Sequence, residues 1–367
     1  MTLRILHTES SPSLGGQELR ILLEMEALAA RGYDSVLVAR PGTPILAEAQ
    51  RRGLRVYGVP LRSSLDLPSM IKLALLMRRH RIDVVNAHNS KDGWNAALVA
   101  RMLSIPVIRS RHIASRIRTG YFSRLIYGPL CDVVMTTGRD IGAGLVERGV
   151  NADRIEAIPT GIDPDRFANA QPGALRVDLG IPAGATLIGQ IAVLRGDKGP
   201  EYFVRAAQQL LSEGFDAWFV LVGEGPARKH VEAQLAAGGH ASRIKLAGFR
   251  RDIPAILADL DLFVLAARSP EGVPQAILQA HAARVPVVAT TVGGVREVAI
   301  HEETALCTAP RDVAGLASAM RKLIEDRELA SQLAERGHRM TREHYSLNLM
   351  LERMDRLYRR LAASRRR

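Results

Sequence analysis

The sequence has 367 residues, 47% of them hydrophobic, and this predicts two or three domains with an ample buried core. It has no apolar run near the roughly 18 residues of a membrane-spanning helix, and residues 1–13 lack the organisation of a signal peptide. The two cysteines, Cys131 and Cys307, exclude a disulfide framework and have no metal-binding spacing. We therefore expect a cytoplasmic protein.

The formal net charge is +12, from 50 Lys and Arg against 38 Asp and Glu, and the excess is spread over both halves. Only 4% of the residues are aromatic and no known nucleic-acid-binding motif is present, which argues against a nucleic-acid partner. An anionic membrane surface or an anionic substrate accounts for the charge at least as well.

The first half of the chain alternates short apolar strands with helices. Gly15 and Gly16 follow the first expected strand, where open α/β sheets bind ligands, although a plain turn remains the alternative. The expected strands are Leu3–Thr8, Asp34–Ala39, Leu54–Val59, Ile82–Ala87, Pro106–Ser110, Leu130–Thr136 and Arg154–Ile158, and the helices are Gln17–Ala30, Pro44–Arg52, Leu67–His80 and Lys91–Leu103. This alternation is typical of a parallel sheet with helices on both faces.

The second half repeats this pattern after an irregular stretch at 159–185. The expected strands are Leu187–Ala192, Ala217–Val222, Ile244–Ala247, Leu262–Leu265 and Val287–Thr290, and helices are expected from Pro200 and at 311–325 and 327–340. An amphipathic segment at 346–361 follows. The sequence thus predicts an α/β protein with two Rossmann-like, doubly wound parallel-sheet domains that face each other across a cleft.

The loop Glu271-Gly272-Val273-Pro274 lies between a buried strand and a helix expected to start near Val273 and Pro274. Gly272 allows the backbone to approach a ligand closely, and Pro suits a first helical turn. Free N–H groups and the positive end of the helix dipole then form an anion site. Gln279 lies about two turns further along, so it can project back toward this site. The alternative is an ordinary turn between a strand and a helix.

Arg195 and Lys198 follow another strand and are spaced to reach a common anion. Arg can bind two oxygens at once, whereas Lys acts as a point charge. Considered alone, the spacing favours two solvated surface charges. His88 and His112 each follow a strand of the first half and are expected to point into the cleft, although a histidine at a strand end is more often structural.

Two of these stretches resemble motifs of the retaining glycosyltransferases of family 4, which use nucleotide-sugar donors. Glu271-Gly272-Val273-Pro274 matches the start of their E-G-x-P-x-x-x-x-E signature, and the residues from Arg195 to Gly199 match R-x-x-K-G. The resemblance covers most of the chain and implies the GT-B architecture. Residues 1–168 are then an acceptor-binding domain, residues 169–345 a donor-binding domain, and residues 346–367 a helix that crosses back to the first domain.

The resemblance also implies a role for each candidate residue. The expected catalytic residues are Arg195 and Lys198 at the donor phosphate, Glu271 at the hydroxyls of the donor sugar, and His112 on the acceptor side. The expected donor-binding residues are Gly15, Gly16, Arg195, Lys198, Arg250, Glu271, Gly272, Val273 and Gln279, and the expected acceptor-binding residues are His88, Asn89, Lys91 and His112. No protein nucleophile is expected, because in the family the leaving phosphate is thought to take the acceptor proton.

Gln279 departs from the family pattern, which has a second Glu at this position to accept hydrogen bonds from the nucleotide ribose. Gln keeps one acceptor oxygen but loses the charge, so we expect altered donor affinity with activity retained. Asp259-Leu260-Asp261 matches the D-x-D of metal-dependent glycosyltransferases, but it lies at the start of a strand, away from the cleft. We therefore expect no metal and no cofactor.

A stretch rich in basic and aromatic residues, 109–126, begins at the end of the expected strand Pro106–Ser110 and includes His112. It combines Arg109, Arg111, Arg116, Arg118 and Arg124 with Ile113, Ile117, Tyr121, Phe122, Leu125 and Ile126. This mixture suits a lipid headgroup interface, and a solvated face is the alternative. Because family members that build lipid-linked saccharides dock through their first domain, we expect peripheral binding to the anionic inner face of the cytoplasmic membrane.

The sequence therefore predicts a retaining, metal-independent glycosyltransferase that acts on a saccharide, lipid-linked or lipopolysaccharide-type acceptor. A UDP-sugar is the first expectation for the donor and a GDP-sugar the second. Two alternatives remain open at this point: a sugar-nucleotide epimerase of similar architecture, and a non-catalytic subunit that binds a sugar nucleotide. Only Gln279 suggests the second of these.

Overall fold

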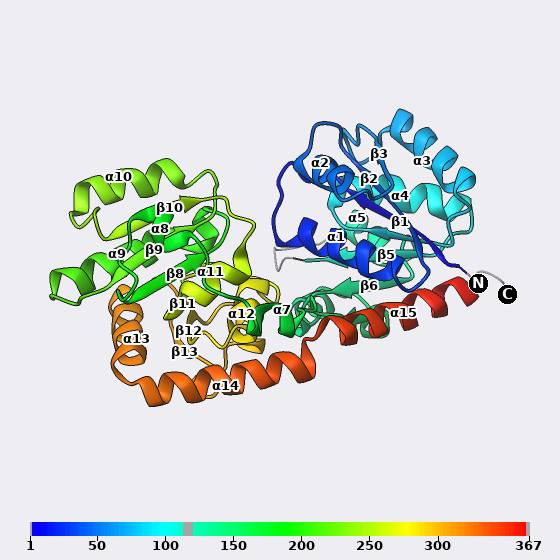
Figure 1. Cartoon of the computed structure of the whole chain (residues 1–367). Coiled ribbons are helices and arrows are strands. Elements are labelled where there is room, and N and C mark those ends of the chain that lie inside the picture. Colours follow the sequence, from blue (N-terminus) through cyan, green and yellow to red (C-terminus); the bar gives the residue numbers. More distant parts are fainter. Residues whose placement is uncertain (1, 113–119, 365–367) are drawn as a thin grey trace. The chain divides into compact units, whose positions relative to one another are not determined.

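The structure is a computed structural model that describes residues 2–112 and 120–364 (Figure 1). The chain divides into two compact units, one formed by Met1–Thr160 with Asn348–Arg367 and the other by Gly161–Leu347. Each unit contains its own parallel sheet and its own hydrophobic core. The boundary precedes the expected one at residue 168, so the short helix α7 (Pro164–Ala168) belongs to the second unit.

The first unit has a parallel sheet with the strand order β3-β2-β1-β4-β5-β6-β7 among its described residues. The strands are β1 (Arg4–Glu9), β2 (Asp34–Ala39), β3 (Val56–Gly58), β4 (Val84–Ala87), β5 (Val107–Arg111), β6 (Val133–Thr136) and β7 (Ile155–Ala157). The central strands are buried along almost their whole length, as expected for a parallel sheet covered on both faces.

The helices of the first unit connect these strands and cover the sheet. They are α1 (Gly16–Ala29), α2 (Pro44–Arg51), α3 (Leu67–Arg79), α4 (Ser90–Met102), α5 (Tyr121–Ile126), α6 (Arg139–Val146), the 3₁₀ turn at Ala152–Arg154 and the C-terminal α15 (Leu347–Ser364). The main core is packed between the sheet and α3, α4 and α6. A second apolar cluster lies under α1 and α2.

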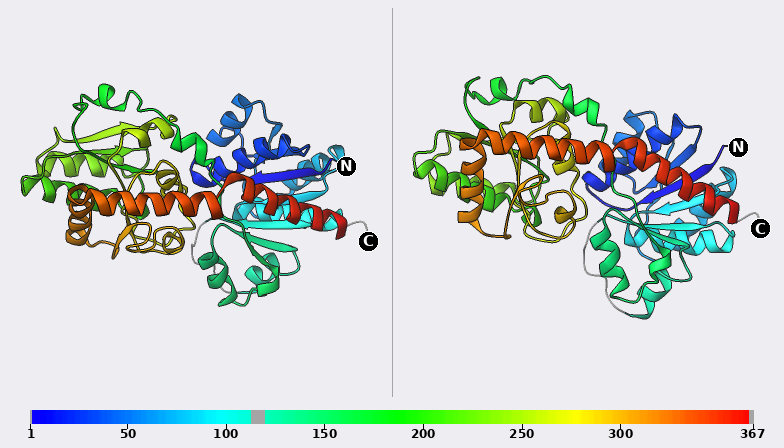
Figure 2. Two further views of the ribbon diagram at one scale, coloured as in Figure 1. Left: turned by 60° about the horizontal axis from the view of Figure 1, so that its bottom comes forward. Right: turned by 90° about the horizontal axis from the view of Figure 1, so that it is seen from below.

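Helix α15 packs on the first unit although it comes from the far end of the chain (Figure 2). Its apolar face buries Met354 and Leu357, and its polar anchor is the fully buried Tyr358. The Tyr358 hydroxyl donates to Glu24 Oε1 at 2.5 Å and accepts from Asn86 Nδ2 at 2.9 Å. A buried hydroxyl satisfied on both sides fixes the register of the helix on α1 and β4.

The second unit has a parallel sheet in the order β10-β9-β8-β11-β12-β13. Its strands are β8 (Leu187–Ile191), β9 (Trp218–Val222), β10 (Ile244–Gly248), β11 (Leu262–Leu265), β12 (Val287–Thr290) and β13 (Leu306–Thr308). Its further helices are α8 (Leu175–Leu179), α9 (Pro200–Ser212), α10 (Arg228–Gly238), α11 (Ile253–Asp259), α12 (Gln275–Ala282), α13 (Val313–Glu325) and α14 (Arg327–His344), with 3₁₀ turns at Gly196–Lys198 and Gly294–Glu297.

These two sheets confirm the predicted fold class of two doubly wound parallel α/β domains. The helix expected from Val273 and Pro274 begins at Gln275, because Pro274 is its N-cap in an extended conformation. Several short helices, such as α6 and α11, were not predicted, since one or two turns give too little periodicity to be recognised. No described helix is both long and apolar enough to cross a bilayer.

Candidate functional site

In each sheet, two neighbouring central strands mark the point where the strand order reverses. From these two strands the chain continues outward toward opposite edges of the sheet. The central pairs are β1 with β4 in the first unit and β8 with β11 in the second. In open α/β sheets, ligands bind at the carboxyl ends of such a pair. The loops that follow these four strands are therefore the candidate binding loops of each unit.

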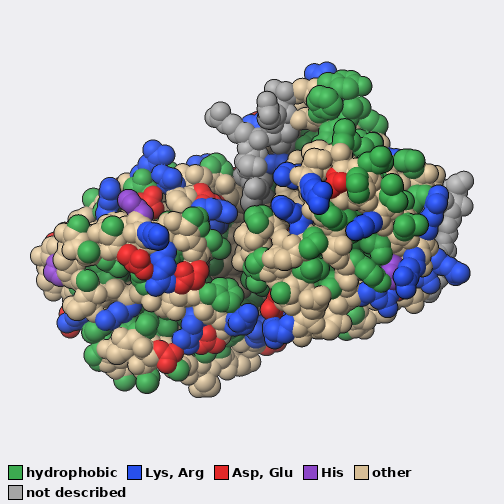
Figure 3. All heavy atoms as spheres, turned by 90° about the horizontal axis from the view of Figure 1, so that it is seen from above, with side chains coloured by type: hydrophobic (Ala, Val, Ile, Leu, Met, Phe, Trp, Pro, Cys, Tyr) green, Lys and Arg blue, Asp and Glu red, His purple; other side chains and the backbone are tan. Residues whose placement is uncertain are grey.

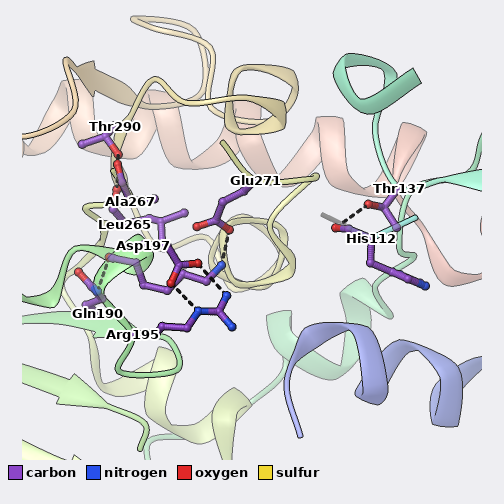
Figure 4. A network of polar contacts seen from close by, with 10 residues as sticks. His112, Thr137, Gln190, Arg195, Asp197, Leu265, Ala267, Glu271 and Thr290 are labelled. Atoms are coloured by element: carbon purple, nitrogen blue, oxygen red, sulfur yellow. Dashed lines mark hydrogen bonds and ion pairs between the residues drawn. The ribbon is translucent and has the colours of Figure 1, made fainter. Parts of the chain in front are cut away.

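In the second unit, Lys198 and Glu271 meet at this edge of the sheet. Lys198 follows β8, Glu271 follows β11, and Lys198 Nζ lies 2.5 Å from Glu271 Oε2 (Figure 4). The Glu271 side chain is 9% exposed and the Lys198 side chain 22% exposed, so the pair is largely removed from water. The other oxygen, Glu271 Oε1, is buried and has no hydrogen-bond partner among the described residues.

Glycines bring these two loops close together. Gly199 has φ +62°, and a Cβ there would lie 1.9 Å from the carbonyl oxygen of Ala266. Gly293 and Gly294 support the second loop, since Gly294 N donates to Glu271 O at 2.9 Å and a Cβ on Gly294 would contact the Gly272 backbone at 2.8 Å. Larger residues cannot occupy these positions without moving the backbone that carries Lys198 and Glu271.

Arg195 lies in the same loop as Lys198 and pairs with Asp197. The guanidinium is bidentate, with Nε at 2.5 Å from Oδ1 and Nη2 at 2.7 Å from Oδ2 of Asp197 (Figure 4). Burial acts to raise the pKa of Asp197, but the hydrogen bond and charge of Arg195 and the charge of Lys198 bring it below its ordinary value. Asp197 therefore occupies Arg195 in the manner of an anion.

Gln190 was not predicted as a site residue from the sequence, yet it hydrogen-bonds to the backbone of the loop that carries Lys198. It is buried on β8, and its Nε2 donates to the Lys198 carbonyl oxygen at 3.1 Å (Figure 4). The sequence did contain a signal, since Gln190 is a polar residue within an apolar strand. A buried amide needs a hydrogen-bond partner, so such a residue indicates a polar contact at that place.

The remaining donor-site candidates of the second unit fall into two groups. Gly272 and Val273 are buried in the Glu271 loop, and Gln279 is half-buried on α12, one turn after Gln275. Arg250 is different, because its guanidinium pairs with Asp178 at 2.6 Å and with Asp252 at 2.7 Å. These two carboxylates raise the pKa of Arg250, and donor binding by this residue stays a prediction.

In the first unit, the candidate glycines lie at the start of α1. Gly15 is the N-cap, and its N–H donates to Glu18 Oε2 at 2.7 Å. Asn89 is the N-cap of α4, where its Oδ1 accepts from Ser90 N, and Lys91 is exposed in the first turn of the same helix. The expected contacts of these residues with donor and acceptor stay predictions.

Three histidines form a hydrogen-bonded chain at the carboxyl ends of β1, β4 and β5. His7 Nδ1 lies 3.0 Å from His88 Nε2, and His88 Nδ1 lies 3.0 Å from His112 Nε2. His7 and His88 are buried, whereas His112 is partly exposed, and its carbonyl accepts from Thr137 (Figure 4). Both ring nitrogens of His88 are occupied by contacts with the other two rings, and its expected contact with the acceptor stays a prediction.

Two buried carboxylates lie beside this chain. Glu9 accepts from Ser11 N at 2.7 Å, from Asn89 Nδ2 at 3.2 Å and from Gln17. Asp92 accepts from the Thr8 and Ser10 hydroxyls at 2.8 and 2.7 Å. Burial, followed by the charge of Asp92, raises the pKa of Glu9 to about 8, and burial also raises the pKa of Asp92.

His7, Glu9 and Asp92 were not predicted as site residues. The signal was present, because His7 and Glu9 are polar residues two positions apart, on one face of β1 close to its carboxyl end. The expected strand Leu3–Thr8 included His7 without giving it a role, and Glu9 lay just beyond the end of that strand.

The Asp259-Leu260-Asp261 motif has structural roles. Asp259 pairs with Arg176 at 3.6 Å and accepts from Gly173 N, while Asp261 Oδ2 accepts from Leu187 N at 2.8 Å. These bonds tie the loop before β11 to its neighbours, as expected for a strand end. The described residues contain no cluster of three or more His, Cys, Asp or Glu that could hold a metal ion.

The basic stretch at 109–126 differs from the expected headgroup interface. Arg109 is buried against Gly93 and donates to the Asn89 carbonyl, and Arg111 donates to the Tyr127 hydroxyl at 2.7 Å. Arg109 points into the unit, which corrects its expected role at a lipid surface, whereas Arg111 is half-buried. Arg116, Arg118, Ile113 and Ile117 lie outside the described residues.

Comparisons with known proteins match both halves of the chain to glycosyltransferase family models. The family model described as Glycosyltransferase Family 4 matches residues 14–166, and the model described as Glycosyl transferases group 1 matches residues 185–326. A relative from Escherichia coli, named UDP-Gal:alpha-D-GlcNAc-diphosphoundecaprenol alpha-1,3-galactosyltransferase, is 26% identical over 347 residues and covers 89% of each chain.

Solved structures show the same fold. A glycosyltransferase from Rickettsia africae superposes with a TM-score of 0.87 at 20% identity, covering 98% of each chain. Anabaena HepE, solved with UDP and glucose, has a TM-score of 0.83 at 20% identity, covering 97% of this chain and 99% of that one. Both halves of the chain and their order along it are thus shared with these proteins.

Proposed function

The chain belongs to the nucleotide-sugar glycosyltransferases of family 4, and we propose that it transfers a hexose from a UDP-sugar to a lipid-linked saccharide with retention of configuration. The observation that carries this proposal is the Lys198–Glu271 pair at the carboxyl ends of β8 and β11. The lysine is suited to a diphosphate, and the carboxylate beside it is suited to sugar hydroxyls. An epimerase or a non-catalytic subunit is not favoured, because the compared relatives are transferases.

The charges of this pair suit the first half of the reaction. Without donor, the Lys198 ammonium and the Glu271 carboxylate neutralise each other. A diphosphate competes for Lys198, and Glu271 can then accept hydrogen bonds from the donor sugar. Negative charge grows on the leaving phosphate as the bond to the anomeric carbon breaks, so a fixed ammonium there lowers the barrier. Arg195 contributes a second cation when the diphosphate replaces Asp197.

Retention follows if the acceptor hydroxyl attacks the anomeric carbon from the face that the phosphate leaves. The bond from the anomeric carbon to the acceptor oxygen forms, and the hydroxyl proton passes to the departing phosphate oxygen. This route needs neither a protein nucleophile nor a metal. Transfer that continues in excess EDTA supports metal independence. An α-linked product from an α-linked donor, identified by NMR, supports retention of configuration. Loss of transfer on chelation that Mn²⁺ restores contradicts metal independence.

The donor is proposed to be a UDP-sugar, in line with the UDP-Gal in the name of the E. coli relative and the UDP in the HepE structure. A thermal-shift panel of UDP-, GDP-, ADP- and dTDP-sugars tests this proposal, because a ligand that binds only the native state raises stability by RT ln(1 + [L]/Kd). Stabilisation by UDP-sugars alone is expected. A larger rise in Tm with GDP-sugars than with UDP-sugars would instead indicate a GDP-sugar donor.

The acceptor is proposed to be a saccharide carried on a membrane lipid, as the name of the E. coli relative indicates for that protein. An apolar surface of the first unit suits this substrate. Tyr121 and Phe122 on α5 are 72% and 71% exposed, and Phe122 packs edge-on against Trp94 of α4. On the neighbouring α3, Leu67, Ile71 and Leu75 form an exposed row at helical spacing.

Basic side chains flank this apolar surface. Lys72, Arg78 and Arg79 are exposed on α3, and Arg124 is exposed on α5. Figure 3 shows hydrophobic side chains gathered on part of the first unit, in the right-hand half of the view, with Lys and Arg among them. Exposed aromatics and leucines with lysines and arginines beside them suit an anionic lipid interface.

Vesicle flotation tests membrane binding. Binding is expected to need anionic lipid and to weaken as salt rises, because charges near the surface are screened. Tyr121→Ser with Phe122→Ser should reduce binding several-fold. Val177→Ser, at a side chain of the second unit that is 83% exposed, is the matched control and should not. Two results would contradict membrane binding through this surface: equal binding to neutral and anionic vesicles, or unchanged binding in the double variant.

A further inference from the structure

The histidine chain of the first unit couples a buried residue to the acceptor side. Its two hydrogen bonds, both 3.0 Å long, use Nδ1 of His7, both ring nitrogens of His88, and Nε2 of His112. The rings follow one another in a column, with centroids 5.3 Å apart and planes 10° apart for His7 and His88, and centroids 5.2 Å apart and planes 34° apart for His88 and His112. The only nitrogens outside the two bonds are His7 Nε2 at the buried end and His112 Nδ1 at the partly exposed end.

Burial favours the neutral form of all three imidazoles. Burial lowers the pKa of His7, and burial together with nearby positive charges holds the pKa values of His88 and His112 well below their ordinary value. A neutral imidazole has one N–H donor and one acceptor nitrogen. The chain therefore has only two arrangements, because the tautomer of any one ring fixes the tautomers of the other two.

In the first arrangement, His112 Nε2–H donates to His88 Nδ1, His88 Nε2–H donates to His7 Nδ1, and His7 carries its proton on Nε2. His112 Nδ1 is then a hydrogen-bond acceptor. In the second arrangement every proton is shifted, His7 Nε2 is bare, and His112 Nδ1–H is a donor. The two arrangements differ at the exposed end in whether the protein accepts or donates a hydrogen bond.

The charges around the column favour the first arrangement. The Glu24 carboxylate acts on His7, and both Glu24 Oε2 and His7 Nε2 are buried without a hydrogen-bond partner among the described residues. The opposite end faces positive charge, since Arg20, Arg109 and Arg111 act on His112. A field that is negative at His7 and positive at His112 draws each proton toward His7.

We propose that His7 and His88 are positioning residues that hold His112 with its proton on Nε2, so that His112 Nδ1 accepts a hydrogen bond from the attacking hydroxyl of the saccharide acceptor. This inference rests on the proposed glycosyl transfer and adds the group that orients the nucleophile. The hydroxyl proton still passes to the leaving phosphate, so His112 stays neutral throughout. A histidine fixed in one tautomer by a second group is an established way to orient a nucleophile.

Two substitutions of His7 separate positioning from simple packing. In His7→Asn, the amide oxygen can take the place of Nδ1 and still accept from His88 Nε2–H, so the first arrangement persists. In His7→Leu, His88 Nε2 loses its buried acceptor and the chain is expected to reverse. His80→Leu is the matched control, since His80 is a half-buried histidine of the same unit that bonds Tyr57 away from the column.

The test combines kinetics with the ¹⁵N shifts of histidine-labelled protein, in which the His112 signals are assigned through His112→Gln. His7→Leu should lower kcat roughly 10²-fold with little change in donor KM, and His7→Asn should stay within a few-fold of wild type. The unprotonated nitrogen of His112 should be Nδ1 in wild type and His7→Asn, and Nε2 in His7→Leu. Thermal unfolding of each variant verifies that it is folded.

Two results would overturn the inference: an equal loss of kcat in His7→Asn and His7→Leu, or a His112 tautomer that His7→Leu leaves unchanged. Failure of the proposed function is distinguishable from both. A wild-type protein that binds no sugar nucleotide and transfers to no acceptor contradicts the function, whereas the ¹⁵N shifts still report the chain in that protein.

Discussion

The Lys198–Glu271 pair allows a prediction whose size follows from the structure. At a separation of 2.5 Å and an effective dielectric of about 20, the attraction of two unit charges is on the order of 6 kcal/mol. Desolvation offsets most of this energy, because Glu271 is largely buried. A coupling of about 1–3 kcal/mol between the two side chains should therefore remain.

A double-mutant cycle measures this coupling. Lys198→Met leaves a buried carboxylate without its cation, and Glu271→Gln leaves the ammonium without its anion, so each change alone should lower the free energy of unfolding. The double variant should regain about 1–3 kcal/mol relative to the sum of the two single effects. Denaturant unfolding in the absence of donor measures the change in the free energy of unfolding for each of the three variants relative to wild type.

Transfer activity should respond differently from stability. Each single variant and the double variant should lose roughly 10²-fold or more in kcat/KM, because in the proposed mechanism both groups act on the donor and neither can substitute for the other. Additive stability effects would refute the pair in the donor-free protein. Unchanged turnover in a folded Lys198→Met variant would refute its role at the phosphate.

Three further predictions concern other residues. Gln279→Glu should lower donor KM about fivefold with little change in kcat, because a charged acceptor for the ribose strengthens that bond by about 1 kcal/mol; an unchanged KM means that the residue does not touch the donor. Burial is the main cause that raises the pKa of Glu9 from its ordinary 4.5 to about 8, so its stabilising contribution is complete below about 4.5 and is lost as the pH rises through about 8. Glu9→Gln, which cannot ionise, should therefore raise the Tm relative to wild type more at pH 9 than at pH 5, and a difference independent of pH contradicts this. Tyr358→Phe should lower the free energy of unfolding by about 1–3 kcal/mol, since polar atoms of Glu24 and Asn86 are left buried without partners; a neutral effect argues against the anchoring of α15.

The strand pattern of both sheets could be predicted from the sequence, because continuous apolar runs such as Leu262–Leu265 are typical of strands buried on both faces. Lys198 and Glu271 could also be predicted, because they match the R-x-x-K-G and E-G-x-P motifs that this chain shares with the family. Their direct contact could not, because 73 residues separate them along the chain and only the sheet order brings them together.

The first unit was harder to interpret for the same reason. His7 lies on β1, whereas His88 and His112 follow β4 and β5. Because β2 and β3 come between β1 and β4 along the chain, only the sheet order β1-β4-β5 aligns the three histidines. Arg109 and Arg111 resembled surface charges because their positions fit an exposed stretch, yet Arg109 is buried and Arg111 is half-buried, each in a hydrogen bond to a neighbouring loop or side chain. A residue type predicts what a side chain can bind, and tertiary structure decides which partner it meets.

The most direct test of the account is the release of UDP from a UDP-sugar in the presence and absence of a lipid-diphosphate-linked saccharide, with product masses measured in parallel. We predict fast release only with the acceptor, a mass gain of one sugar on the lipid, and loss of both in Glu271→Gln. Release at the same rate without the acceptor, or conversion of the donor sugar with no gain of mass on the lipid, would contradict the assignment as a transferase for such acceptors.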